Sequence, residues 1–182
     1  MKTLGDSANK TQSMVYIAIC AVLIAICSWI TIPATIPFTL QTFGVFLTVC
    51  LLGGKRGSLS VFIYIVLGLI GIPVFAGVKG GIGVLLGNTG GYIIGFLFSA
   101  LIMWAMEALL GRKTWILAAS MVIGLIACYA VGTAWFMMVY TSNSGQIGLM
   151  TVLGWCVIPF IIPDFIKMAL ALCVYKQLAK RL

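Results

Sequence analysis

Long apolar stretches that are almost free of charge recur along the whole chain, and they constrain its fold more than any other feature. Of the 182 residues, 63% are hydrophobic and 8% are charged, whereas roughly a quarter of an average globular chain is charged. A soluble domain of this length could not bury so much apolar surface, so lipid must surround most side chains. The alternating polarity of barrel strands is absent. We therefore predict an all-α integral membrane protein with a single transmembrane domain over residues 1–182.

The apolar runs and the residues that break them predict a compact bundle of six membrane-spanning helices. A helix of about 20 residues crosses the hydrocarbon layer once. Because proline is favoured in the first turn of a helix, we expect Pro163 to open the last span. The six expected spans cover about residues 15–32, 38–52, 59–72, 91–110, 115–140 and 163–182.

The basic residues predict the orientation of the bundle. A net charge of +8 could suggest a surface that binds nucleic acid. If the N-terminus is cytoplasmic, however, the positive-inside rule accounts for the charge, because only Lys79 falls in a loop on the outer side. We therefore predict that segment 1–14 and both termini are cytoplasmic, and that nucleic acid is not a partner. The basic residues on the cytoplasmic side are Lys2, Lys10, Lys55, Arg56, Arg112, Lys113, Lys176, Lys180 and Arg181.

An aspartate and a lysine interrupt the last apolar stretch. Asp164 and Lys167 are separated by three positions, so they share one face of a helix. A charge at membrane depth is costly, and such residues face a bundle interior or a cavity. Two interpretations stay open. The residues form an ion pair that positions the last helix, or they form a polar binding point that is open to the outside.

Two segments on the outer side predict the walls of a binding pocket. Residues 71–92 are too rich in glycine for a good helix, and glycine lets the backbone approach a ligand, so we expect a lid rather than a flexible loop. Residues 31–42 are stiffened by two prolines. This face suits a small, mostly apolar ligand with a few polar points. The candidate contacts are Gly83, Asn88, Gln41 and Thr42, with the aromatic side chains of Phe43, Phe75, Tyr92 and Trp135 as walls.

The chain has few residues for catalysis or metal binding. It contains no histidine and three acidic residues, and its six cysteines are scattered without a C-x-x-C motif. Metal-dependent hydrolysis, a Ser-His-Asp triad and a proton relay therefore lack the side chains they need. We expect no enzyme activity, no metal site and no cofactor.

Small residues lie on one face of the first expected span. Ala21 and Ala25 form a small-x-x-x-small pattern, and Ala18 precedes them. Such a pattern allows another helix to approach closely. It predicts either packing within the bundle or a docking surface for a membrane partner.

Three segments together resemble the BioY family, the biotin-specific substrate-binding (S) components of energy-coupling factor transporters. They read PFTLQTFGVFLTVCLLGGKRGSLSV, GIPVFAGVKGGIGVLLGNTGGY and PDFIK, and the resemblance extends from about residue 18 to the C-terminus. It implies a six-helix S component that captures biotin with high affinity at the outer face of the bacterial plasma membrane. It also implies a transmembrane coupling protein and two cytoplasmic ATPases as partners, docked through the A-x-x-x-A face.

The resemblance further implies roles for the site residues. Asp164 would accept hydrogen bonds from the ureido N–H groups of biotin, and Lys167 would donate to its carbonyl or pair with Asp164. Asn88 and Gln41 are candidates for the remaining polar contacts. Two other functions remain open: a self-contained facilitator or channel, and a structural subunit of a membrane complex.

Overall fold

The computed structural model describes residues 9–33 and 36–180, and most of these residues are helical. A short antiparallel pair of strands, β1 and β2, places Thr31 opposite Thr39 and Ile32 opposite Phe38. The elements in chain order are α1 (Lys10–Trp29), β1 (Thr31–Ile32), β2 (Phe38–Thr39), α2 (Gln41–Leu52), α3 (Gly54–Leu69), α4 (Ile82–Leu86), α5 (Gly90–Leu110), α6 (Thr114–Ser144), α7 (Leu149–Cys156) and α8 (Ile158–Ala179).

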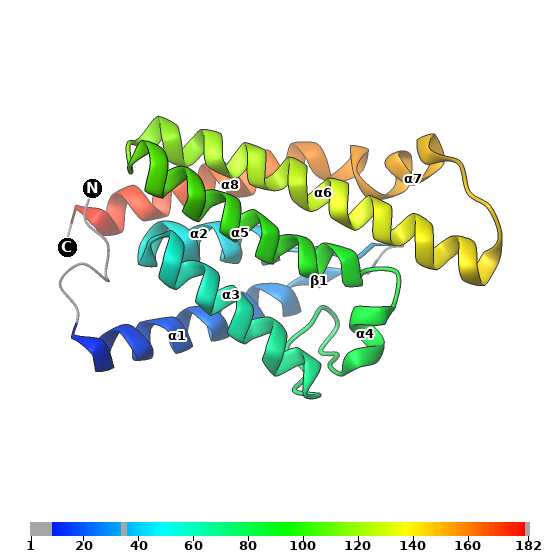
Figure 1. Ribbon diagram of the computed structural model, residues 1–182, viewed down its shortest axis with the longest axis horizontal. Helices are drawn as coiled ribbons and strands as arrows, with labels where there is room; N and C mark the ends of the chain where they lie inside the picture. The colour runs from blue at the N-terminus through cyan, green and yellow to red at the C-terminus, as the bar shows by residue number, and fades with distance from the viewer. Residues whose placement is uncertain (1–8, 34–35, 181–182) are drawn as a thin grey trace.

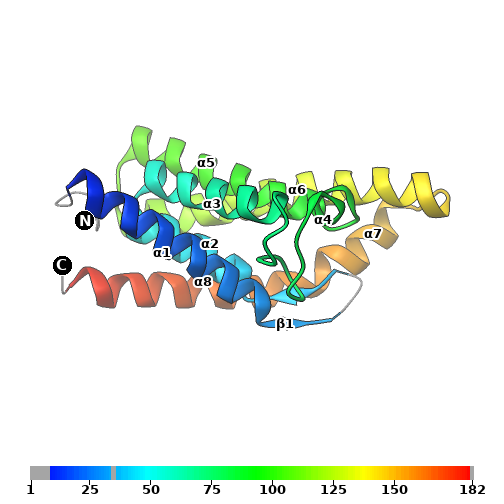
Figure 2. The same ribbon diagram turned by 90° about the horizontal axis from the view of Figure 1, so that it is seen from below.

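The long helices lie side by side, and successive passes of the chain run in opposite directions (Figure 1 and Figure 2). Helices α1, α3 and α6 run one way, and α2, α5 and α8 return. We call the end where α1 begins and α8 finishes the basic end, because Lys10, Lys55 and Lys176 lie in the terminal turns there. The opposite end, which carries β1, β2, α4 and the start of α7, is the loop end.

The structure confirms a helical membrane protein but not six full-length spans. Four helical stretches in the described residues are long and apolar enough to cross a membrane: α1, α5, α6 and the combined stretch Leu149–Ala179. The expected second and third spans are α2 with 12 residues and α3 with 16. Every residue of α2 except Phe43 is buried. Because protein rather than lipid surrounds α2, this helix need not match the thickness of the bilayer.

Two helix boundaries differ from the sequence prediction. Helix α1 begins at Lys10, so the described part of the expected cytoplasmic segment 1–14 is already largely helical; residues 1–8 lie outside the described residues. Helix α8 begins at Ile158 and contains Pro163 in its interior. The favoured first-turn position is taken by Pro159 instead. Asp164 and Lys167 therefore lie about one turn further into the helix than expected.

Glycines allow neighbouring helices to approach within backbone contact. A Cβ atom at Gly57 of α3 would lie 2.6 Å from the Cα atom of Val49 in α2. A Cβ atom at Gly124 of α6 would lie 2.5 Å from the Oγ atom of Ser99 in α5. Without a hydrophobic driving force between helices in lipid, such close contacts supply much of the attraction through van der Waals packing. The glycines thus fix how closely α2 packs against α3 and α5 against α6.

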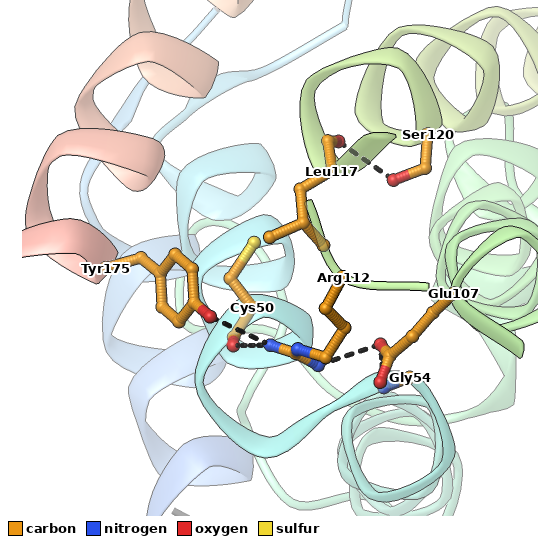
Figure 3. A network of polar contacts seen from close by, with 7 residues as sticks. All are labelled: Cys50, Gly54, Glu107, Arg112, Leu117, Ser120 and Tyr175. Atoms are coloured by element: carbon orange, nitrogen blue, oxygen red, sulfur yellow. Dashed lines mark hydrogen bonds and ion pairs between the residues drawn. The ribbon is translucent and has the colours of Figure 1, made fainter. Parts of the chain in front are cut away.

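A partly buried ion pair at the basic end joins four helices (Figure 3). The Nη1 atom of Arg112, in the turn between α5 and α6, lies 2.8 Å from the Oε2 atom of Glu107. Arg112 also donates hydrogen bonds to the carbonyl of Cys50 at the end of α2 and to the hydroxyl of Tyr175 in α8. Glu107 accepts a hydrogen bond of 2.7 Å from the backbone N–H of Gly54. The pair therefore satisfies backbone groups that the break between α2 and α3 leaves without helical partners.

Gly57→Ala is expected to destabilise the protein by about 1–3 kcal/mol, because the added methyl group overlaps the backbone of α2. The matched control is Gly154→Ala on α7, where a Cβ atom meets nothing within 4 Å and the substitution should be neutral or mildly stabilising. Unfolding by SDS in detergent micelles measures both. Equal stability of Gly57→Ala and the unmodified protein would contradict the close approach of α2 and α3.

Candidate functional site

A cavity of about 420 Å³ lies at the loop end, between the β1–β2 hairpin, the glycine-rich segment and helices α5, α6 and α8. The structure thus brings together three segments that the sequence analysis placed on the outer side. The predicted site residues that line the cavity are Gln41, Thr42, Phe75, Gly83, Tyr92, Asp164 and Lys167.

Asp164 and Lys167 form a buried ion pair on the wall of this cavity. The Nζ atom of Lys167 lies 2.8 Å from the Oδ1 atom of Asp164, and the two residues are 5% and 3% exposed. The same Nζ atom lies 4.3 Å from the centre of the Phe38 ring, a cation–π distance. Phe38 in turn stacks on Phe160 with ring centres 5.5 Å apart. The pair therefore connects α8 to the hairpin.

Tyr129 of α6 is a site residue that the sequence analysis missed. Its hydroxyl donates a hydrogen bond of 2.6 Å to the Oδ2 atom of Asp164, and its side chain lines the cavity. Both oxygens of the Asp164 carboxylate thus have a partner from the protein. The available signal was a tyrosine in the middle of an apolar span, since a buried tyrosine hydroxyl requires a hydrogen-bond partner.

Gln41 and Phe75 are held in place from behind the cavity. The Nε2 atom of Gln41 donates a hydrogen bond of 2.9 Å to the hydroxyl of Tyr64, which is buried in α3. The ring of Tyr64 meets Phe75 edge to face, with ring centres 5.6 Å apart. Phe75 also packs against Gly68, where a Cβ atom would overlap its ring. Protein contacts hold both side chains in place, so they offer preformed surfaces to a ligand.

The glycine-rich segment crosses one side of the cavity as turns and the short helix α4. Phe75 and Lys79 form an isolated antiparallel bridge, and the carbonyl of Gly87 accepts a hydrogen bond of 3.0 Å from the indole N–H of Trp135. The backbone between α3 and α5 is therefore mostly non-helical, as predicted, and it is anchored at two points. The exposed side chain of Lys79 adds a second cation to the cavity lining.

Three aromatic or polar candidates lie outside the lining. Asn88 is exposed, whereas its neighbours Gly87 and Thr89 line the cavity. Phe43 and Trp135 do not line the cavity. Trp135 instead holds the glycine-rich segment through its hydrogen bond to the carbonyl of Gly87. Among the described residues, no group of three or more His, Cys, Asp or Glu side chains could hold a metal ion.

The three alanines of α1 separate into two faces. Ala21 and Ala25 are 2% and 5% exposed and belong to the hydrophobic core. Ala18 is exposed, on the same outer face as Val22 and Ile26. The small-x-x-x-small pair therefore packs inside the bundle, and only Ala18 is accessible to a partner.

The comparisons with known proteins agree with the resemblance that the sequence suggested. A family model described as the BioY family matches residues 1–182. The chain is 36% identical to the biotin transporter BioY of Thermotoga maritima over 170 residues, which cover 93% of this chain and 96% of the relative. It is 44% identical to the probable biotin transporter BioY of Pyrococcus horikoshii over 144 residues, covering 79% and 80%.

The fold is also similar to that of a solved structure. The S component for biotin from an energy-coupling factor (ECF) type ABC transporter matches with a TM-score of 0.82 and 29% sequence identity. The match covers 96% of this chain and 95% of the other. The chain therefore belongs to the BioY family.

Proposed function

We propose that this protein is the biotin-binding S component of an energy-coupling factor transporter in the bacterial plasma membrane. The observation that carries the proposal is a cavity lined by a buried, paired aspartate and lysine. Its volume of about 420 Å³ falls within the usual range for small-molecule sites, roughly 300–1,000 Å³. Relatives over nearly the whole chain are biotin transporters, so we assign binding and transport rather than catalysis.

The chemistry of the ion pair suits the ureido ring of biotin. That ring presents N–H donors beside a carbonyl acceptor, and the pair presents a carboxylate acceptor beside an ammonium donor. Each oxygen of Asp164 has one protein partner and can accept a further hydrogen bond from a ureido N–H. Lys167 donates to the ureido carbonyl. The ion pair has no net charge, so it suits the neutral ureido ring of biotin better than it would suit the carboxylate at the end of the biotin tail.

The remaining lining fits the rest of the ligand. Phe75 and Tyr92 provide flat walls for the sulfur-containing ring and the aliphatic tail, and Gln41 and Thr42 provide polar contacts. The side chain of Lys79 supplies a cation for the tail carboxylate. The open space at Gly83 leaves room for the ligand beside the backbone. We propose that Asn88 contacts the ligand only after this glycine-rich segment closes over it.

We also propose the orientation and the partners. In this proposal the basic end and both termini face the cytoplasm, and the cavity at the opposite end faces the outside. The energy for uptake comes from a transmembrane coupling protein and two ATPases. The docking face is centred on Ala18 with Val22 and Ile26, because these residues are exposed on α1 whereas Ala21 and Ala25 are buried.

Asp164→Asn and Lys167→Met should each lower the affinity for biotin about 10- to 100-fold, the value of a charge-assisted hydrogen bond. Isothermal titration calorimetry of the purified protein measures this. Each single change leaves one buried charge unpaired, which itself destabilises the protein. The double variant Asp164→Asn/Lys167→Met has no charge at either position, so it tests binding without that destabilisation. Wild-type affinity in the folded double variant would sink the assignment.

Lys79→Ala serves as the orientation control for this experiment. It should weaken the binding of biotin but leave the binding of biotin amide unchanged, because the amide has no carboxylate. The ion-pair variants should weaken both ligands. If Lys79→Ala affected the two ligands equally while the pair variants discriminated between them, biotin would lie in the cavity the other way round.

Tyr129→Phe should lower biotin affinity about tenfold while the protein remains folded. Removal of the hydroxyl leaves the Oδ2 atom of Asp164 without its hydrogen bond, so the carboxylate is no longer held in one orientation. Tyr140→Phe on the same helix is the matched control, because Tyr140 stacks on Phe136 and lies outside the cavity lining. Equal biotin affinities in calorimetry for the two variants would remove Tyr129 from the site.

Ala18→Trp should reduce co-purification with the coupling protein and the ATPases while the affinity for biotin stays unchanged. The indole would stand out from the face on which the coupling protein docks. Leu109→Trp places the same bulk on α5, at a side chain that is 83% exposed, and should leave the complex intact. Pull-down from membranes that express all subunits measures the outcome. An intact complex with Ala18→Trp would show that the partner docks elsewhere.

A further inference from the structure

A second cavity, of about 740 Å³, lies at the basic end between the first turns of α1 and α3 and the last turns of α5. It shares no lining residue with the cavity at the loop end. The biotin site and the docking face proposed above do not use it. Its lining combines charged side chains with apolar ones.

Three cations line this cavity: Lys10 from α1, and Lys55 and Arg56 from the first turn of α3. None of their side chains has an ion-pair or hydrogen-bond partner among residues 9–33 and 36–180. The first turn of α3 carries no acidic residue, and the anion at this helix end is Glu107, which accepts a hydrogen bond from the Gly54 N–H. Lys10 and Lys55 are exposed and Arg56 is half-buried, so all three cations are accessible to an anionic ligand.

The one carboxylate in the lining does not neutralise these cations. Glu107 is already engaged by Arg112 at 2.8 Å and by the backbone N–H of Gly54 at 2.7 Å (Figure 3). Arg112 is a fourth cation beside this cavity and takes up the charge of Glu107. Among the residues that the structure describes, no carboxylate neutralises the charges of Lys10, Lys55 and Arg56.

A buried hydroxyl provides an independent sign of a missing polar ligand. Ser13 of α1 lines the cavity and is 8% exposed, and its Oγ atom has no hydrogen-bond partner among the described residues. A buried polar group without a partner costs free energy. The Oγ atom itself is buried, so an anion seated between the cations would become its partner once the Ser13 side chain rotates toward the cavity.

The apolar side of the cavity identifies the kind of anion. Leu59 and Trp104 line it and are 46% and 38% exposed, so they face lipid. Tryptophan is typical of the interface between hydrocarbon and water. A ligand that meets the cations and these side chains at once has a charged headgroup and a hydrocarbon chain. We propose that this cavity binds an anionic phospholipid, with its phosphate at Lys55, Arg56 and Ser13 and an acyl chain against Leu59 and Trp104.

Native mass spectrometry of the detergent-purified full chain, titrated with phosphatidylglycerol or phosphatidylcholine, tests the proposal. The wild-type protein should retain one phosphatidylglycerol in clear preference to phosphatidylcholine. The double variant Lys55→Ala/Arg56→Ala should bind phosphatidylglycerol roughly 25-fold more weakly, since each cation contributes about fivefold to the attraction of anionic lipid. Ser13→Ala should weaken binding by a smaller factor.

The control variant is Lys113→Ala/Lys176→Ala, which removes the same charge at the same end but outside the cavity. It should keep wild-type lipid affinity, and all variants should keep wild-type biotin affinity as proof of folding. If both double variants lost the same affinity for phosphatidylglycerol, the net charge of the basic end rather than this cavity would account for the binding, which contradicts the proposal. Equal retention of both lipids by the wild-type protein would overturn the proposal without any variant.

Two further results would assign the cavity to another ligand. Inorganic phosphate that binds as tightly as phosphatidylglycerol, and displaces it, would make this a free phosphate site rather than a lipid site. If no phosphatidylglycerol is retained and Lys55→Ala/Arg56→Ala loses the coupling protein in pull-down, the cations belong to a protein interface. Either result contradicts the lipid assignment.

Discussion

The pairing of charge in an interior that excludes water is the constraint on which the rest of this structure depends. Both carboxylates in the described residues lie 2.8 Å from a cation: the partly buried Glu107 from Arg112, and the buried Asp164 from Lys167. An unpaired charge at Asp164 or Lys167 would cost several kcal/mol. The two pairs differ in what else they meet. Arg112 donates to the last turn of α2 and Glu107 accepts from the first turn of α3, so that pair is a structural joint. Asp164 and Lys167 face a cavity, so their remaining capacity is available to a ligand.

The joint at the basic end also positions the site at the loop end. Arg112 holds the last turn of α2 through the carbonyl of Cys50, and the helix extends from there as one short, buried rod to Gln41. The length of α2 therefore sets the depth of Gln41 and Thr42 in the bundle. A helix that spanned the full bilayer would carry these two residues to the surface. Because α2 has 12 residues, its polar first turn ends beneath the hairpin and lines the cavity.

The sequence predicted the membrane class, the breaks in the apolar runs and the convergence of residues 31–42, 71–92 and Asp164 at one end. These follow from hydropathy, from glycine and proline, and from the cost of a charge in lipid, all of which are local properties. The depth of Ala21 and Ala25 and the role of Tyr129 could not be read in the same way. A small residue permits close packing on either face of a helix, and only tertiary structure decides which face is inside. Pro163 was misread because Pro159 occupies the first turn of the same helix.

The contacts of Lys167 link access to the cavity with the state of its ion pair. Its ammonium group lies against the ring of Phe38, and that ring stacks on Phe160 of α8. Any outward movement of the hairpin that is large enough to widen the cavity must break both contacts. Lys167 then loses the ring that shields it, while Asp164 keeps its bond to Tyr129 of α6. The carboxylate thus stays fixed on the rigid helices while the surroundings of the ammonium group change. Because donor and acceptor both lie on α8, movement of the hairpin changes how well the ammonium group is shielded from water, whereas the ion pair itself does not depend on the hairpin.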